Sequence, residues 1–240
     1  MSENLFINAP RALGDQIICN GLYRNVSQAY ERCIIPVRKS LHLSMTEMLS
    51  DLTNVEFLVF PDRIARYSTY VSDYFFGKLG FDIIRIGYSG ENFPSKSGVK
   101  WDENYYLQAG LDFKLRWLGF HAPRNTLREE ELYQILGCEG EPYIFVHEDA
   151  SRGFLIESSL LPKNMRQVRP RPDLKEFTIF DYRKVIESAS TIHCIESSFT
   201  ALIESMDINV PKYAHRYSRP EAKRDWWHEY TYASKWEVIN

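Results

Sequence analysis

Short apolar runs alternate with longer amphipathic stretches along the first half of the chain, and this alternation limits the fold more than any other feature. Ile17, Leu22 and Val26, for example, recur at helical spacing between the first two apolar runs. The pattern predicts strands at residues 5–10, 32–38, 55–61 and 81–88, and helices at residues 14–30, 44–52 and 63–80. Strands that alternate with helices favour parallel pairing through crossover connections, so the predicted class is α/β with a doubly wound sheet.

A second strand series begins after a break at residues 138–142, Cys-Glu-Gly-Glu-Pro. Further helices are predicted before it, the last one over residues 126–137 with Thr126 as its N-cap. The second series has strands at residues 143–148, 192–196 and 210–218, helices at 181–191 and 197–206, and a long loop with one short strand over 151–171. We therefore expect two Rossmann-like lobes with parallel sheets, at residues 1–138 and 139–220, and a C-terminal closing helix at 221–240 that packs back on the first lobe.

Composition excludes several classes of protein. The 240 residues are 44% hydrophobic and 25% charged, which is typical of a globular chain, and the net charge of -3 gives no basic field for nucleic acid. The four cysteines are scattered without a Cys-x-x-Cys pair, which disfavours a zinc knuckle or a disulfide framework. No signal peptide and no transmembrane segment is expected, and these features together favour the cytoplasm.

The segment Ile192–Met206 places an acid and two hydroxyls between an apolar strand and a helix. In open α/β sheets, ligands bind beyond the carboxyl ends of the strands, so Ser197 and Ser198 are candidates to hold a phosphate and Glu196 to hold a ribose or sugar hydroxyl. The alternative is that Ser197 only caps the helix. An acid at the end of an apolar strand must remain solvated or find a partner.

The first predicted strand is followed by the same arrangement, a short loop with Gly14 and a helix that starts near Asp15. Gly14 permits close backbone approach or a positive φ, and Asp15 is a candidate general base or a residue that complements the helix dipole. One glycine is not the G-x-G-x-x-G pattern of a dinucleotide-binding dehydrogenase.

A third cluster follows the first strand of the second series, and it contains His147, Glu148, Asp149, Ser151 and Arg152. Arg152 is the best candidate cation for a diphosphate, because a guanidinium binds phosphate bidentately. A metal site is disfavoured, since no second His or Cys stands at ligand spacing.

Other polar residues have simpler interpretations. His193 and Cys194 lie within an apolar strand and are predicted core residues, while Tyr213, His215 and Arg216 follow later. The basic run Lys163, Arg166, Arg169, Arg171 and Lys175 is interpreted as a solvated face or as an electrostatic lip for an anionic substrate.

Taken together, these residues resemble a GT-B glycosyltransferase, most closely of the heptosyltransferase-like family. A Gly-Asp pair of that family resembles Gly14-Asp15, and an Asp-Thr-Gly-Leu segment that opens a late helix resembles Glu196-Ser197-Ser198-Phe199. The chain departs from the pattern at Ser198, where the family usually has Gly, and at Ala201, where it has His. The fucosyltransferase-like family is an alternative relative.

The resemblance implies transfer of a sugar from a nucleotide-sugar donor to a saccharide or glycoconjugate hydroxyl, with inversion and with no metal or other cofactor. It implies a donor on the second lobe and an acceptor on the first. Asp15 would be the base, and the residues implied in donor binding are Gly14, Gln16, His147, Arg152, Glu196, Ser197 and Ser198. Two alternatives stay open: a non-catalytic protein that binds a nucleotide or nucleotide sugar, and an interaction scaffold with its aromatic segments at an interface.

Overall fold

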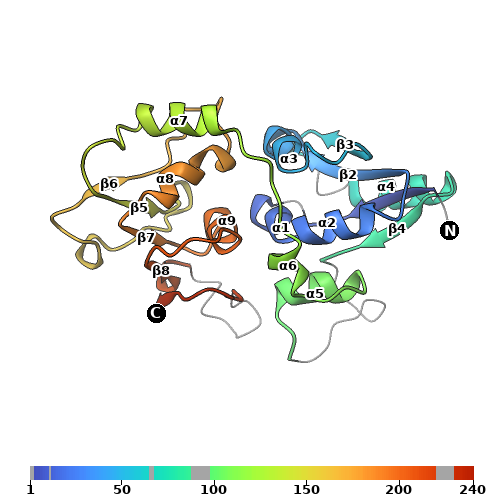
Figure 1. The fold of residues 1–240 in the computed structure, drawn as a ribbon. Helices are drawn as coiled ribbons and strands as arrows, with labels where there is room; N and C mark the ends of the chain where they lie inside the picture. Colours follow the sequence, from blue (N-terminus) through green and yellow to red (C-terminus); the bar gives the residue numbers. More distant parts are fainter. Residues whose placement is uncertain (1–2, 11, 65–67, 88–97, 220–229) are drawn as a thin grey trace. The chain divides into compact units, whose positions relative to one another are not determined.

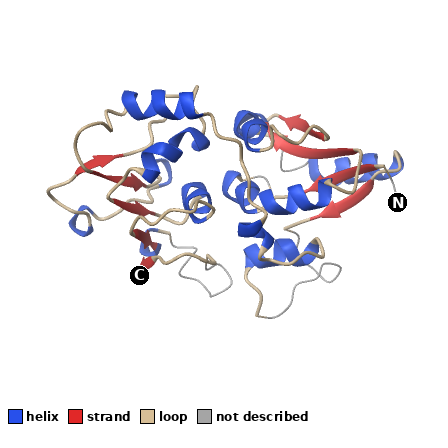
Figure 2. Cartoon of the chain, viewed as in Figure 1, coloured by secondary structure: helices blue, strands red, loops and turns tan. Residues whose placement is uncertain are grey.

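The structure is a computed structural model that describes residues 3–10, 12–64, 68–87, 98–219 and 230–240. The chain divides into two compact units, Met1–Pro123 and Arg124–Asn240. Each unit contains one parallel sheet with helices around it (Figure 1; Figure 2). The α/β class and the two Rossmann-like units predicted from the sequence are confirmed.

The first unit contains a four-stranded parallel sheet in the order β3-β2-β1-β4. Its strands are β1 (Asn4–Asn8), β2 (Arg32–Arg38), β3 (Val55–Phe60) and β4 (Asp82–Arg85). Leu5, Phe6 and Ile7 of β1 are all fully buried. Because successive side chains of a strand point to opposite faces, both faces of this sheet are covered, as expected for the doubly wound class.

The helices of the first unit agree with the predicted series, with one break. They are α1 (Leu13–Ile18), α2 (Asn20–Ser27), η1 (Lys39–Leu41), α3 (His42–Met48), α4 (Ser68–Lys78), α5 (Trp101–Gln108) and α6 (Leu115–Leu118). The single helix predicted over residues 14–30 is wrong, because it is divided into α1 and α2 at Cys19, whose ψ is 0°. Gly21 of α2 packs on α6 so closely that a Cβ there would lie 1.9 Å from the Leu115 carbonyl oxygen.

The second unit contains a five-stranded parallel sheet in the order β6-β5-β7-β8-β9. Its strands are β5 (Tyr143–His147), β6 (Arg166–Val168), β7 (Thr191–Cys194), β8 (Lys212–His215) and β9 (Glu237–Ile239). Its helices are α7 (Thr126–Ile135), η2 (Ala150–Arg152), η3 (Ser158–Leu160), η4 (Ile179–Tyr182), α8 (Arg183–Glu187), α9 (Ser198–Glu204) and η5 (Arg216–Ser218). A core of Ile144, Val146, Ile156, Leu161 and Ile195 packs on β5.

The boundary between the units lies between Pro123 and Arg124, earlier than the predicted boundary at Glu139. The reason is that α7 packs on η4 and α8 of the second unit. Arg128 pairs with the buried Asp181, and Arg124 with Glu187. The cap of α7 is Asn125, whose side chain accepts a hydrogen bond from the Arg128 backbone N–H, so the predicted cap at Thr126 is wrong by one position.

The predicted closing helix at residues 221–240 is wrong over its described part. Residues 220–229 lie outside the described residues, and Glu237–Ile239 form β9, which pairs in parallel with β8 of the second unit. The Glu204 carboxylate at the end of α9 accepts hydrogen bonds from Ser234 Oγ at 2.7 Å and Trp236 Nε1 at 2.6 Å, and also from the backbone N–H groups of Ala233 and Ser234. This buried acid anchors the last segment of the chain to its own unit.

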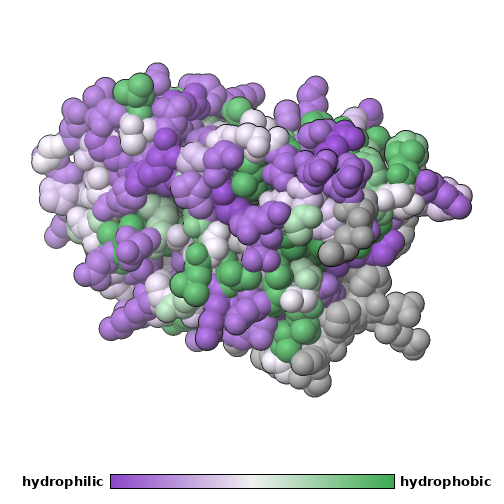
Figure 3. Space-filling model, turned by 45° about the vertical axis from the view of Figure 1, so that its right-hand side comes forward, coloured by the Kyte–Doolittle hydropathy of each residue, from purple (hydrophilic) through white to green (hydrophobic). Residues whose placement is uncertain are grey.

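The surface of the chain is mixed in character. One face has apolar side chains scattered in patches among polar ones (Figure 3). Exposed apolar residues include Tyr74 and Phe75 of α4 and Leu79 directly after it. No helix in the described ranges has the length and apolar composition that crossing a membrane requires.

Candidate functional site

The carboxyl ends of β5 and β7 bring two of the predicted site residues into contact. The strands are parallel neighbours with His147 opposite Cys194, so the segments that follow them meet at the same edge of the sheet. There the Ser197 hydroxyl lies 3.0 Å from His147 Nδ1. The sequence predicts each residue separately, and the structure shows that they form a pair.

His147 is a neutral histidine at physiological pH. Burial lowers its pKa to about 4, and although Asp149 opposes this shift, Arg152 adds to it. The imidazole packs on the Phe199 ring, with 4.5 Å between ring centroids. A neutral imidazole has one N–H donor and one acceptor nitrogen, so its hydrogen bonding depends on which nitrogen has the proton.

Arg152 lies close to this pair and is 54% exposed. Its Nε donates to Asp149 Oδ2 at 2.6 Å, and its guanidinium stacks over the Phe154 ring at 4.9 Å from the centroid. Within the described ranges neither Nη atom has a hydrogen-bond partner. The hydrogen bond from Ser151 and the ion pair with Arg152 lower the pKa of Asp149, so this carboxylate orients the guanidinium while the Nη groups stay accessible to an anion.

Glu196 is buried and already has partners. Its side chain is 5% exposed, accepts a hydrogen bond from the Tyr232 hydroxyl at 3.1 Å, and lies 3.5 Å from Arg216 Nε. Burial raises the pKa of this carboxyl, while Arg216 opposes the shift. The acid thus has the partners that its position requires. Both contacts are made by Oε1 of the carboxylate.

The start of α9 tests two expectations, the length of the predicted helix and the capping role of Ser197. The helix has seven residues, and the Ser197 side chain makes no capping hydrogen bond to its backbone. The alternative that Ser197 only caps the helix is therefore wrong, because its hydroxyl pairs with His147 instead. Ser198, the first residue of α9, is half-buried beside this pair.

In the first unit, Asp15 lies in the first turn of α1 at the carboxyl edge of the sheet. Its Oδ1 accepts a hydrogen bond from the Tyr105 hydroxyl of α5 at 3.2 Å. Gly14 is an ordinary residue of α1, so the positive φ considered for it is wrong. Gln16 of α1 is buried, donates to the Pro10 carbonyl and accepts from the Tyr23 hydroxyl at 2.6 Å, so both polar ends of its side chain have partners inside the unit.

A buried ion pair lies in the same unit. Arg116 of α6 and Asp102 of α5 are in contact, with both side chains 0% exposed, and the guanidinium lies 5.0 Å from the centroid of the Trp117 ring. Sequence reasoning missed this pair, because the two residues belong to separate amphipathic segments without a motif. The pair anchors α5, the helix that provides Tyr105.

The remaining polar residues are mostly structural. His193 and Cys194 are buried as predicted, and His193 Nδ1 lies 3.1 Å from Nε2 of His215, which is also buried. In the basic run, Arg166 donates to the Leu136 and Gly137 carbonyls, Arg169 lies 3.5 Å from Glu148, and Arg171 pairs with Asp173. The described residues include no group of three His, Cys, Asp or Glu side chains that could hold a metal ion. All four cysteines are free and buried.

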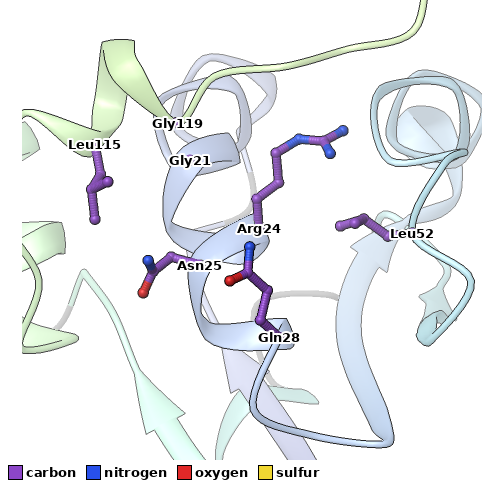
Figure 4. Close-up of a pocket in the computed structure, with 7 residues that line it drawn as sticks. All are labelled: Gly21, Arg24, Asn25, Gln28, Leu52, Leu115 and Gly119. Atoms are coloured by element: carbon purple, nitrogen blue, oxygen red, sulfur yellow. The ribbon is translucent and has the colours of Figure 1, made fainter.

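A pocket of about 280 Å³ lies in the first unit. Figure 4 shows its lining, which consists of Gly21, Arg24, Asn25, Gln28, Leu52, Leu115 and Gly119. Gln28 and Leu52 lie in segments that lead into β2 and β3, so the pocket is at the amino edge of the sheet. It contains none of the predicted site residues.

Comparison with known proteins establishes the fold. The chain is similar to the structure of a glycosyl transferase family 9 protein from Veillonella parvula, with a TM-score of 0.51 and 10% identity, over 89% of this chain and 81% of that one. It also matches ADP-heptose LPS heptosyltransferase II of E. coli, with a TM-score of 0.48 and 12% identity over 89% and 84% of the two chains. No family model and no curated protein matches the sequence.

Two parallel α/β units with this similarity define a fold of the GT-B glycosyltransferase class. The resemblance to the heptosyltransferase-like proteins is therefore confirmed for the fold. At 10% identity it says nothing of the substrate.

Proposed function

We propose that this chain is a glycosyltransferase that moves a sugar from a nucleotide-sugar donor to a hydroxyl of a saccharide or glycoconjugate, without a metal and with inversion. The observation that supports it best is the cluster of His147, Ser197 and Arg152 at the carboxyl edge of the second sheet, on a fold of the GT-B class. This edge is where open α/β sheets bind ligands. A cytoplasmic location is part of the proposal, since it suits four free cysteines.

In this proposal the donor diphosphate contacts the Nη groups of Arg152 and the hydroxyl of Ser198. The acceptor oxygen bonds to the anomeric carbon from the face opposite the diphosphate. The bond from that carbon to the diphosphate oxygen breaks, and its electron pair leaves with the nucleoside diphosphate, whose developing charge Arg152 stabilises. Asp15 takes the proton of the acceptor hydroxyl, and the Tyr105 hydroxyl orients its carboxylate.

The test combines binding and turnover. A ligand that binds only the folded state raises the melting temperature, so a thermal-shift screen with nucleoside diphosphates and nucleotide sugars, with and without Mg²⁺, identifies the donor. Release of nucleoside diphosphate from that donor then measures turnover. We expect Asp15→Asn to lower turnover by about 10²- to 10⁴-fold and to leave nucleotide binding intact, since a general base contributes about that factor.

Arg152→Ala is expected to weaken binding of a nucleoside diphosphate far more than binding of the nucleoside. Arg171 and Asp173 provide matched controls, because they form a similar exposed ion pair in the same unit. Arg171→Ala and Asp173→Asn should leave both assays unchanged. Full turnover by Asp15→Asn would eliminate Asp15 as the base. Nucleotide binding without turnover of any donor would favour the non-catalytic binding protein, and a wild-type chain that binds no nucleotide would favour the scaffold.

A further inference from the structure

The hydroxyl of Ser197 has an unusual partner for a residue in its position. Ser197 precedes the first residue of α9, where a serine side chain ordinarily accepts a hydrogen bond from the helix backbone. Here it makes no such bond, and its hydroxyl instead contacts the imidazole of His147 at the end of β5. A residue that gives up helix capping for a bond to histidine points to a role for that histidine.

The hydrogen bond between Ser197 and His147 can run in either of two directions, depending on the tautomer of the ring. Ser197 Oγ has one hydrogen, and Nδ1 of His147 is the acceptor found for it among the described residues. If Ser197 donates, Nδ1 has no proton and the single proton of the neutral ring is on Nε2. If the ring donated from Nδ1 instead, the hydroxyl hydrogen would lack this acceptor and Nε2 would present a lone pair.

We propose that Ser197 is a positioning residue that donates its hydrogen to Nδ1 of His147, and thereby fixes the tautomer whose Nε2–H donates to a phosphate oxygen of the bound nucleotide. The phosphate part of this inference rests on the proposed function. The tautomer part stands on the geometry of the pair alone.

Three observations support this assignment. The ring is held against Phe199, so its orientation is fixed by packing as well as by Ser197. In the parts of the chain that the structure describes, Nε2 has no hydrogen-bond partner, and it is not among the buried polar atoms without one, so it remains accessible. Arg152 contributes to the low pKa of His147, which places a cation close to the ring, and a second donor there would serve the same anion.

Imidazole ¹⁵N shifts measure the tautomer directly. The full-length protein is labelled at the ring nitrogens of its six histidines, and the His147 signals are assigned by their loss in His147→Gln. At pH 7 without ligand, we expect the proton on Nε2 of His147. Ser197→Ala should give a mixture of tautomers, and Ser197→Thr should restore the wild-type spectrum. Ser205→Ala, at the other end of α9, is the control and should change nothing.

Binding of the nucleoside diphosphate that the screen identifies tests the role of Nε2–H. A glutamine side chain places its amide NH₂ near the position of Nε2, whereas asparagine places it near Nδ1. His147→Gln is therefore expected to keep most of the affinity, and His147→Asn to lose about tenfold or more, which is the typical value of a hydrogen bond to a charged group.

The outcomes separate the two proposals. A wild-type proton on Nδ1, or an unchanged tautomer in Ser197→Ala, would overturn the positioning role of Ser197, whatever the protein binds. Equal losses of affinity in His147→Gln and His147→Asn, with both variants folded by their melting curves, would overturn the phosphate contact. If the wild-type chain binds no nucleotide, the proposed function and the phosphate contact fall, while the spectra still decide the tautomer.

Discussion

Arg116 and Asp102 are the residues of the first unit whose contribution to stability is best defined by the structure. Both side chains are 0% exposed and face one another inside the unit, between α6 and α5. Replacing one member removes the opposite charge that it provides to the other. The loss in free energy of unfolding then exceeds the net contribution of the intact pair.

We predict that Asp102→Ala destabilises the first unit by about 3–5 kcal/mol, because it leaves the Arg116 guanidinium buried without that carboxylate. Urea denaturation monitored by circular dichroism measures the loss. Glu56→Ala is the matched control, since Glu56 pairs with Arg32 on the surface and such exposed pairs contribute about 0–1 kcal/mol. Similar losses for the two variants would contradict the prediction.

At the scale of residues, the sequence indicates which side chains are candidates for the site better than it indicates which of them are in contact. His147, Ser197 and Arg152 are singled out by residue type and by their place after strands, but the contact of His147 with Ser197 depends on the register of β5 and β7. Gln16 and Glu196 show the opposite case. Their positions indicate ligand binding, and the structure adds that Tyr23 donates to Oε1 of Gln16 and Tyr232 to Oε1 of Glu196.

At the scale of elements, α2 and α6 approach each other through two glycines. The Cα of Gly21 lies 3.2 Å from the position that a Cβ on Gly119 would occupy, and a Cβ on Gly21 would collide with the Leu115 backbone. Backbone atoms cannot swing aside as a side chain does, so any larger residue at Gly21 must separate the two helices.

We expect Gly21→Ala to lower the free energy of unfolding by about 1–3 kcal/mol, the typical cost of overpacking, despite the better helix propensity of alanine. Gly77→Ala in α4 is the control, because a Cβ there meets no atom within 4 Å. That variant should be neutral or up to about 1 kcal/mol more stable. Thermal melting of both variants measures the difference, and a stabilised Gly21→Ala would show that the helices separate without cost.

Most of the fold could be predicted because its strands are continuous apolar runs, which sheets covered on both faces require. β2, β3, β4, β5 and β8 fall within predicted strands, and β1 and β7 each begin one residue before theirs. The errors concern short elements that depend on tertiary contacts. The helix breaks at Cys19, two residues before the close approach of Gly21 to α6, and β9 pairs with the edge of β8 while Glu204 anchors the segment before it. Neither contact is visible in local periodicity.

At the scale of the whole molecule, the two units differ in their response to acid. His147, His193 and His215 all belong to the second unit, and burial lowers the pKa of each to about 4 from an ordinary value near 6.5. Between these values the unfolded chain binds more protons than the folded unit, so stability falls as the pH falls. The raised pKa of Glu196 acts in the opposite direction and offsets part of the effect.

We predict that the second unit is destabilised when the pH is lowered from about 7 to about 4, across the interval between the unfolded and folded pKa values of these three histidines. Scanning calorimetry across this range measures the melting temperature. The double variant His193→Met and His215→Met should show a smaller pH dependence, because it removes two of the three groups. A second unit that melts at one temperature throughout the range would contradict the assignment of these histidines as neutral.

The contacts of Glu204 also join the second unit to a segment that is synthesised last. This buried carboxylate receives its hydrogen bonds from residues 233–236, and β8 receives its outer neighbour only when β9 has formed. The last described strand of the first unit ends at Arg85 and the unit itself ends at Pro123, so it can fold while the second unit is being made, since domains generally fold as units from the N-terminus. Until Ile239 has been added, the Glu204 carboxylate lacks these hydrogen-bond donors and β8 lacks its pairing with β9.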